Sequence, residues 1–273
     1  MNNVFAFIVI SMVACTAVGM PLRENPPDSQ ILYRDELLQS LRPACNRAGG
    51  DVLVERFHQM YGIEKDQYRK DLLSIVWDAT YTAQTRVLAA LDYSRISSDE
   101  EIASQFLYVT DTNNEFRASC TFVPLSHFSK FDNLLDYSRK TLWFQTTNDV
   151  ARFDQLPFAS FWRGRIRAKR ISDDERRQVL EMYQELLMAP SIATVLSSDL
   201  VLVDADPAYA KSELRKTTIL RWMPFTNSVP ENMQPYFSKY FLKAYQAFKD
   251  IQDVPCSIPT ETFPKKLAEQ PDP

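Results

Sequence analysis

Glycine is scarce in this chain of 273 residues, in which it occurs only five times. β-Sandwiches and β-barrels need glycine at many tight turns, and phosphate-binding loops need it next to the ligand. Neither GxGxxG nor GxxxxGK[ST] occurs in the sequence. The scarcity favours an all-α fold and argues against a nucleotide-binding domain.

Residues that build metal and catalytic sites are also rare. The chain has two histidines, His58 and His127, and it contains no HExxH, GxSxG or CxxC motif. Asp204 and Asp206 are the one carboxylate pair that suggests acid–base chemistry or metal binding. Asp206 precedes Pro207, which is better explained as a helix start. We therefore expect a non-enzymatic protein with no cofactor and no metal.

Charge is absent from residues 4–18, which are almost continuously apolar. This length fits the hydrophobic region of a secretory signal peptide and falls short of the ~20 residues that a membrane-spanning helix needs. Ala17 and Gly19 supply the small side chains expected before a cleavage point. We expect a signal peptide at 1–19 and a secreted, extracellular protein with no transmembrane segment.

Signal removal would change the cysteine count. It would discard Cys15 and leave Cys45, Cys120 and Cys256. In an oxidising compartment two of these are expected to form a disulfide bond, and three pairings are open. The third cysteine would be either a buried thiol or the link of a disulfide-linked dimer.

The rest of the chain reads as one helical domain. We expect a flexible leader at 20–30, a single domain at 31–254 that could divide into two halves near 164–171, and an extended Pro-rich tail at 255–273. The net charge of −4 gives no general attraction to nucleic acid, so no specific nucleic-acid binding is expected. No internal repeat of fixed period is apparent.

Apolar spacing predicts an irregular multi-helix bundle built around a long helix near 66–92. Ser-x-x-Glu patterns at Ser98, Ser172 and Ser228 predict capping boxes at three further helix starts. Other helices are expected at 31–41, 51–61, 128–144 and 207–214, and a phenylalanine seam follows Ser228. Segments 105–125 and 192–203 have local strand propensity, which leaves one short hairpin open.

The densest charge cluster is the basic run, residues 163–170, which contains Arg163, Arg165, Arg167, Lys169 and Arg170. Three interpretations compete. The run could be the solvated end of a helix that begins near Phe158, or a polyanion site for a sulfated glycan with Trp162 available to stack. Alternatively, it resembles the Arg-x-Lys-Arg recognition site of furin-like proprotein convertases, with cleavage after Arg170 releasing a C-terminal chain.

Aromatic residues at helical spacing allow one further hypothesis. A small apolar ligand could lie between helices among Tyr68, Trp77, Phe237, Phe241 and Phe248, although such residues more often form ordinary core. Taken together, the sequence favours a secreted, non-enzymatic protein that binds an extracellular protein or a small apolar ligand. A processed proprotein and a polyanion-binding protein are the alternatives.

Overall fold

The structure is a computed structural model that describes residues 26–42, 48–111, 113–147, 155–229 and 231–246. These residues are mostly helical and contain no strand, which confirms the all-α prediction. The hairpin left open by the sequence is therefore wrong for both segments. The predicted signal peptide and the whole of the predicted Pro-rich tail lie outside the described residues.

The helices follow one another with short connections. In chain order the described residues form α1 (Pro26–Ser40), α2 (Gly50–Tyr61), α3 (Lys65–Trp77), α4 (Ala83–Ile96), α5 (Asp99–Phe106), α6 (Asn114–Phe122), η1 (Val123–Ser126), α7 (Phe131–Thr147), α8 (Gln155–Arg167), α9 (Asp173–Leu186), α10 (Ile192–Ala205), α11 (Pro207–Ala210), α12 (Glu213–Trp222), η2 (Met223–Ser228), η3 (Glu231–Met233), α13 (Gln234–Tyr236) and η4 (Phe237–Leu242).

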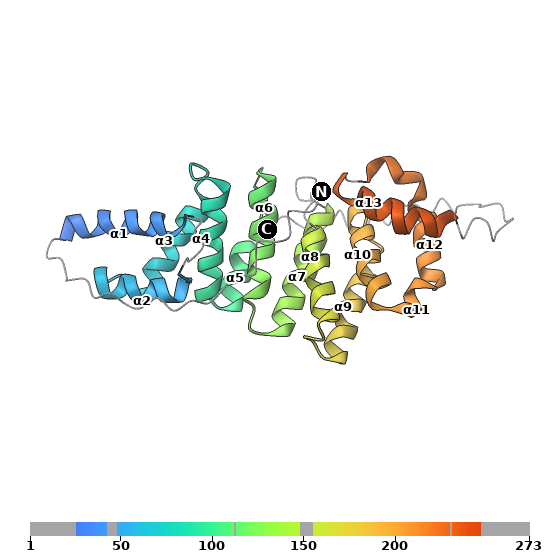
Figure 1. Cartoon of the computed structure of the whole chain (residues 1–273), viewed down its shortest axis with the longest axis horizontal. Helices are drawn as coiled ribbons and strands as arrows, with labels where there is room; N and C mark the ends of the chain where they lie inside the picture. The colour runs from blue at the N-terminus through green and yellow to red at the C-terminus, as the bar shows by residue number, and fades with distance from the viewer. Residues whose placement is uncertain (1–25, 43–47, 112, 148–154, 230, 247–273) are drawn as a thin grey trace, which may run out of the picture.

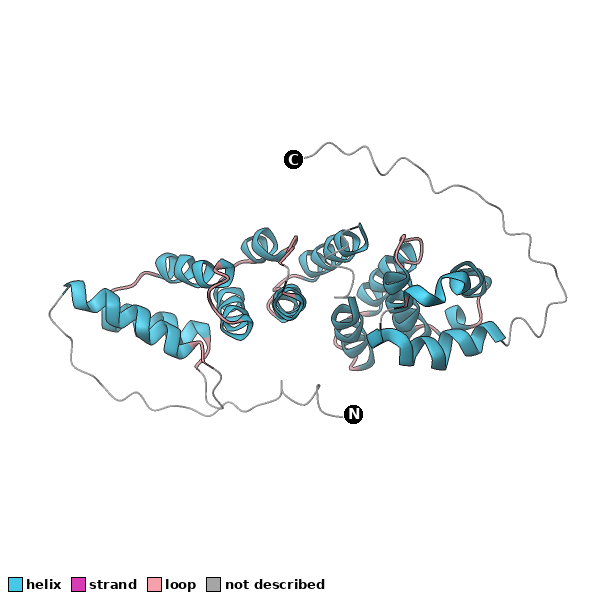
Figure 2. Ribbon diagram, turned by 90° about the horizontal axis from the view of Figure 1, so that it is seen from above, coloured by secondary structure: helices cyan, strands magenta, loops and turns pink. Residues whose placement is uncertain are grey.

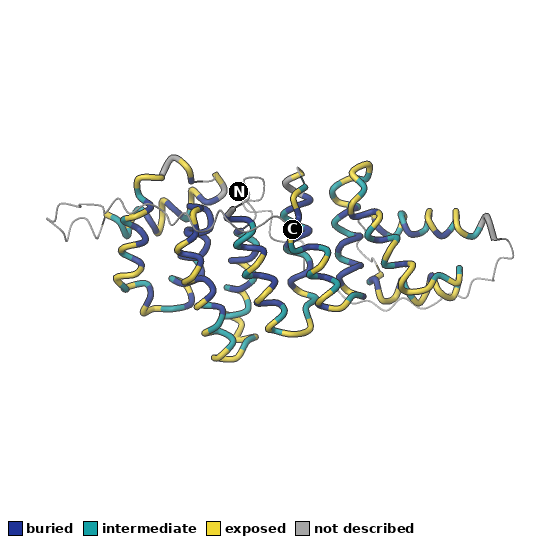
Figure 3. Tube along the Cα trace, turned by 180° about the vertical axis from the view of Figure 1, so that it is seen from behind, coloured by how far each residue is buried: buried dark blue, intermediate teal, exposed yellow. Residues whose placement is uncertain are grey.

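The helices are arranged in an elongated array that runs from α1 to α13 (Figure 1). Viewed from above, many of them are seen end-on in two staggered rows (Figure 2). α2, α4, α6, α8 and α10 pack on one another in succession, as do α5, α7 and α9, and hairpin partners such as α3 and α4 join the rows. Buried residues occur along the whole array (Figure 3) and form one continuous apolar cluster. Each helix is therefore stabilised mainly by its near neighbours in sequence, as in stacked helical proteins.

The long helix predicted near 66–92 is wrong, because α3 ends at Trp77 and α4 begins at Ala83. The Asp78 carboxylate accepts hydrogen bonds from the Thr80 backbone N–H (2.9 Å) and hydroxyl (2.7 Å). The Thr82 hydroxyl then accepts from the Thr85 N–H (3.2 Å) and caps α4. These local bonds stabilise a turn in a segment whose apolar spacing alone suggests continuous helix.

Two of the three predicted capping boxes are confirmed. Ser98 and Glu101 cap α5, and Ser172 and Glu175 cap α9, with both reciprocal hydrogen bonds present. The third prediction is wrong, because Ser228 is the last residue of η2 and does not begin a helix. The short 3-10 helix η3 follows it instead of the predicted α-helix. The phenylalanine seam nevertheless begins as expected, with Phe237 and Phe241 buried.

Other helix boundaries differ more modestly. α1 begins at Pro26, five residues inside the predicted flexible leader, and the predicted helix at 207–214 is divided between α11 and α12. The helix at 51–61 is confirmed, and Gly62 ends it in the left-handed conformation (φ 66°) that glycine adopts without strain.

One cap joins two helices that are distant in sequence. The Asp99 carboxylate, in the first turn of α5, accepts hydrogen bonds from the Ser129 N–H (2.8 Å), the Lys130 N–H (3.0 Å) and the Asn133 amide (3.0 Å) at the start of α7. Burial alone would raise the pKa of Asp99, but these hydrogen bonds outweigh it and lower the pKa. The ionised carboxylate therefore fixes α5 against α7.

The close approach of α2 to α4 at Gly50 makes the packing of these two helices testable by mutation. A Cβ at Gly50 would lie 2.8 Å from the Asp92 carbonyl oxygen, whereas a Cβ at Gly49 would meet only the side chains of Asp51 and Arg95. Gly50→Ala should lower the free energy of unfolding in urea by about 1–3 kcal/mol, because backbone must move. Gly49→Ala, the matched control, should cost less than about 1 kcal/mol. Equal losses in the two variants would contradict the packing of these helices.

Candidate functional site

The basic run forms the C-terminal end of α8 and the turn that follows it. Arg163 donates from Nε to Asp204 Oδ2 (2.7 Å), and Arg167 donates from Nη2 to Asp204 Oδ1 (2.6 Å). Asp204 lies near the end of α10, so the two ion pairs join α8 to α10. The interpretation of the run as the basic end of a helix agrees with this geometry, although the helix begins at Gln155.

Asp204 neutralises part of the basic run. Burial would raise the pKa of Asp204, but hydrogen bonds and charge from Arg163 and Arg167 lower it below its usual value. Arg165 lies over the Phe161 ring, 5.5 Å from its centre. Within the part of the chain that the structure describes, Arg165, Lys169 and Arg170 form no ion pair. Only three cations of the run are therefore without an acidic partner.

The turn after α8 has a defined hydrogen-bonded shape. The Lys169 N–H donates to the Ile166 carbonyl (3.1 Å), and the Arg170 N–H donates to the Arg165 carbonyl (2.9 Å). Lys169 has a φ of 51°, the one positive φ among the described residues other than glycine. These features define a Schellman motif, whose left-handed position is usually occupied by glycine. A lysine there is strained by roughly 1 kcal/mol or more.

Two observations argue against a polyanion site at this turn. Asp173, Asp174 and Glu175 occupy the first turn of α9, where they stabilise the helix dipole and oppose the field of the basic run. Trp162, which was expected to stack on a ligand, is completely buried and donates from Nε1 to the Ser138 hydroxyl (3.3 Å). The ring therefore belongs to the core.

The remaining residues considered for chemistry have structural roles or lie apart. Asp206 accepts from the Ala208 N–H (2.9 Å) and caps α11, as its position before Pro207 predicts. His58 lies on α2, with its Nδ1 atom 3.5 Å from Glu64 Oε1. His127 lies elsewhere, and its pKa is lowered by burial and, to a smaller extent, by the charge of Arg95. Within the described residues no group of three or more His, Cys, Asp or Glu side chains is placed to hold a metal.

The aromatic residues that were proposed for an apolar pocket and that the structure describes do not gather at one site. Tyr68 packs against Phe57 in α2, with ring centres 5.6 Å apart, and Trp77 packs against Phe106 and Phe116. Phe237 and Phe241 belong to η4, which follows α13, and this C-terminal segment lies at the opposite end of the array from α1 to α3 (Figure 1). Phe248 lies outside the described residues. Tyr68, Phe237 and Phe241 are buried core residues of separate regions, whereas Trp77 is 42% exposed.

The structure narrows the disulfide prediction. Cys120 is a free, buried thiol in α6, and burial raises its pKa well above the usual range. Cys45 and Cys256 lie outside the described residues. A pairing of Cys45 with Cys256 is therefore the alternative that stays a prediction.

A buried charge network that sequence reasoning missed holds the C-terminal helices together. The Asp199 carboxylate in α10 accepts hydrogen bonds from Arg215 Nε (3.0 Å) in α12, from the Tyr209 hydroxyl (3.0 Å) in α11 and from the Tyr236 hydroxyl in α13. Asp199 is completely buried and Arg215 is 7% exposed. The one sequence signal was an acidic residue inside an apolar segment, because such a residue requires a buried partner.

A second missed feature is an exposed apolar surface beside this network. Met188 follows α9 and is 63% exposed, and Phe225 in η2 is 49% exposed. Arg221 Nη1 lies 3.9 Å from Met188 Sδ, its guanidinium lies 5.7 Å from the Trp222 ring centre, and the Trp222 and Phe225 ring centres are 5.3 Å apart. We call these four residues the Met188–Phe225 surface.

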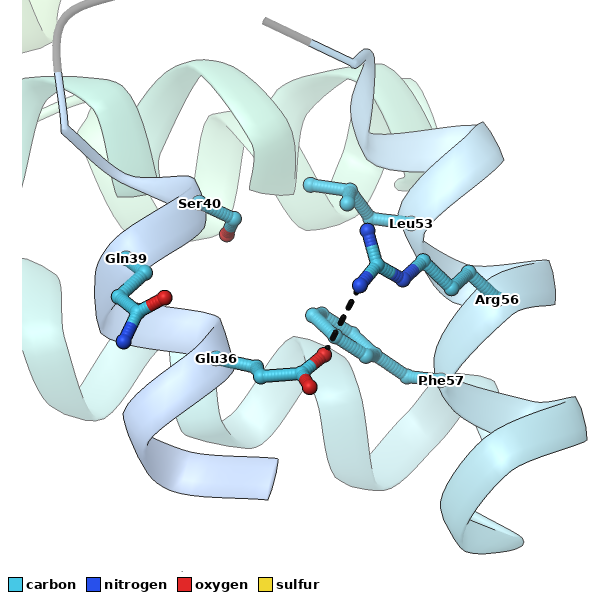
Figure 4. Close-up of a pocket in the computed structure, with 6 residues that line it drawn as sticks. All are labelled: Glu36, Gln39, Ser40, Leu53, Arg56 and Phe57. Carbon is cyan, nitrogen blue, oxygen red and sulfur yellow. Dashed lines mark hydrogen bonds and ion pairs between the residues drawn. The ribbon is translucent and has the colours of Figure 1, made fainter. Parts of the chain in front are cut away.

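Two clefts lie at the other end of the array. The cleft between α1 and α2 has a volume of about 260 Å³, and Arg56 crosses it to donate to Glu36 (3.0 Å) above Phe57 (Figure 4). The cleft between α1 and α3 measures about 470 Å³, and there the Tyr33 hydroxyl donates to Asp71 (2.8 Å). The first cleft is lined largely by polar side chains, and the second combines Ile31, Leu37, Ile63 and Ile75 with polar groups such as Asp71. An apolar ligand in either cleft would therefore meet an ion pair or a carboxylate.

Comparison of the chain with protein-family models, with curated protein sequences and with solved structures gave no match in any of the three. None of the helices in the described ranges is both long and apolar enough to cross a membrane. Any function of this chain must therefore be inferred from its own geometry.

Removing the Asp199 charge should strongly destabilise the fold. Asp199→Asn leaves Arg215 buried without a counter-charge, so the free energy of unfolding should fall by about 3–5 kcal/mol. Asp204→Asn is the matched control, because it breaks more exposed ion pairs and should cost about 1 kcal/mol or less. Denaturant unfolding of both variants gives the comparison, and a loss for Asp199→Asn no larger than the control would contradict the network.

The tyrosines predict a loss of stability at alkaline pH. Burial, followed by the charge of Asp199, raises the pKa of Tyr209 and Tyr236 far above 10 in the folded protein. Unfolded tyrosines lose their protons near pH 10, so this contribution is complete below pH 10 and is lost as the pH rises above it. Urea midpoints should therefore fall as the pH rises from about 10 to about 11. In Tyr209→Phe with Tyr236→Phe the fall should be smaller, and an unchanged slope would contradict the assignment.

Proposed function

We propose that the protein is exported and acts by binding a protein partner through the Met188–Phe225 surface. The observation that carries the proposal is the composition of this surface, because methionine, arginine and large aromatic side chains are enriched at the centres of protein interfaces. Here Met188, Arg221, Trp222 and Phe225 lie in one chain of contacts. The export part of the proposal comes from the segment at 1–19.

The surface rests on a well-ordered frame. Trp222 is 5% exposed, so it anchors the exposed Phe225 to the core. Its helix, α12, is fixed to α10 by the ion pair between Arg215 and Asp199. A side-chain cluster that is held in place before binding loses less conformational entropy when a partner arrives.

Other ligand classes fit the described residues less well. A small apolar ligand would meet polar side chains in both clefts between the first three helices. A sulfated glycan would meet Asp173, Asp174 and Glu175 next to the three cations of the basic run that lack an acidic partner. A protein partner with an apolar cluster at its centre matches the Met188–Phe225 surface better than either alternative.

The test removes the apolar character of the surface without touching the core. Met188→Asp combined with Phe225→Asp should reduce retention of the partner by at least about tenfold, because hot-spot residues each contribute about 2 kcal/mol or more. The measurement is affinity capture from the extracellular fluid in which the protein occurs, followed by mass spectrometry and by binding kinetics with the protein identified.

Val52→Asp is the matched control, because Val52 is a 57% exposed apolar residue on α2 at the far end of the array. A partner kept by the native chain and by this control, but lost by the double variant, supports the proposal. Equal binding to all three chains would overturn it, provided that their thermal unfolding is the same.

A further inference from the structure

The turn that joins α8 to α9 is exposed and carries a basic sequence that a protease could recognise. Ala168, Lys169 and Arg170 are exposed there, and Ile171 is half-buried. Exposed turns between helices are the preferred sites of proteolytic cleavage. The sequence Arg167-Ala168-Lys169-Arg170 places two adjacent basic residues immediately before Ile171.

The folded shape of this turn opposes cleavage. An endoprotease binds its substrate in an extended conformation. In the Schellman motif, by contrast, the backbone N–H groups of Lys169 and Arg170 are hydrogen-bonded to the carbonyls of Ile166 and Arg165. Arg167 is also held by Asp204. Cleavage therefore requires the last turn of α8 to open.

A glycine weakens that last turn. Gly164 lies inside α8, where glycine disfavours helix relative to alanine. A Cβ at this position would meet no atom within 4 Å, so packing does not require glycine there. Gly164 and the strained Lys169 favour opening, and the ion pairs of Asp204 oppose it.

We propose that a secretory endoprotease specific for paired basic residues cleaves the Arg170–Ile171 bond, and that the two resulting chains remain associated as one particle. One water molecule is consumed, which leaves a carboxylate on Arg170 and an ammonium group on Ile171. The proposal rests on the export part of the proposed function. It differs from release of a free C-terminal chain, which the sequence alone suggested.

The association follows from the packing across the turn. α7 packs on α9, and α8 packs on α10, so both interfaces join residues before the cut to residues after it. Phe158 and Trp162 in α8 are completely buried, as are Val195 and Leu196 in α10. The Gln155 amide also donates to the Thr194 hydroxyl inside this interface. Separation of the chains would expose the centre of the core.

The predicted disulfide bond between Cys45 and Cys256 would add a covalent link to this association. Cys45 lies before the cut and Cys256 lies after it, and they are the two cysteines left when Cys120 is buried as a free thiol. A disulfide bond between them would join the two chains. Non-covalent association must therefore be measured after reduction.

The experiment treats the purified full chain with a purified furin-like convertase and follows it by intact mass under reducing conditions. The native chain should give two species that meet at Arg170 and Ile171 and that elute together on native size exclusion with reductant. Arg170→Ala should abolish this cut. Absence of a cut in the native chain under conditions that cleave its urea-unfolded form, or separation of the two species, would overturn the proposal.

Two variants test the opening step. Gly164→Ala should slow cleavage about two- to fivefold, because it strengthens the last turn of α8. Asp204→Asn should accelerate it about two- to fivefold, because it releases Arg167. If both variants were cleaved at the native rate, opening of the last turn of α8 would not control cleavage. Signal removal is scored separately from the mass of the N-terminal chain in secreted protein, and none of these assays depends on the Met188–Phe225 surface.

Discussion

Burial of residues 192–199 of α10 on every side is the constraint on which the C-terminal half of the array depends. Every residue from Ile192 to Asp199 is buried, and α8, α9 and α11 all pack on this helix. A helix that is apolar all round needs neighbours all round, so its sequence dictates a crowded environment. Its few polar groups must then find partners inside the core, as Asp199 does with Arg215 and Thr194 does with Gln155.

The two proposals depend on different parts of the same helix. Asp204, near the end of α10, holds the basic end of α8 in its folded form. Asp199, about 1.4 turns earlier, fixes α12, the helix that carries Arg221 and Trp222 and leads into η2 with Phe225. A cut in the turn between α8 and α9 leaves both sets of contacts in place. Cleavage and partner binding are therefore compatible in one folded particle.

What the sequence could predict follows from the range of the interactions. Capping is local, so the pattern at Ser172 was sufficient to predict the start of α9. The strand propensity of residues 200–203 was misleading, because these residues belong to α10, which is enclosed by other helices. The break after Trp77 depends on a hydrogen bond to the side chain of Asp78. A prediction from the spacing of apolar residues takes no account of such a bond. The ion pair of Asp199 with Arg215 and the surface around Phe225 join separate elements. An acidic residue inside an apolar segment indicates that a buried partner is needed, but no local pattern identifies that partner.

Native-state hydrogen exchange of α10 tests the central claim, which is that this helix is the core of the C-terminal half. Its hydrogen-bonded backbone amides, from Val195 to Ala205, should exchange only through global unfolding, and those of the peripheral α1 should exchange earlier by local opening. Protection of α8 and α9 where they face α10 should follow the same global event. Exchange of α10 as fast as that of α1 would contradict the account.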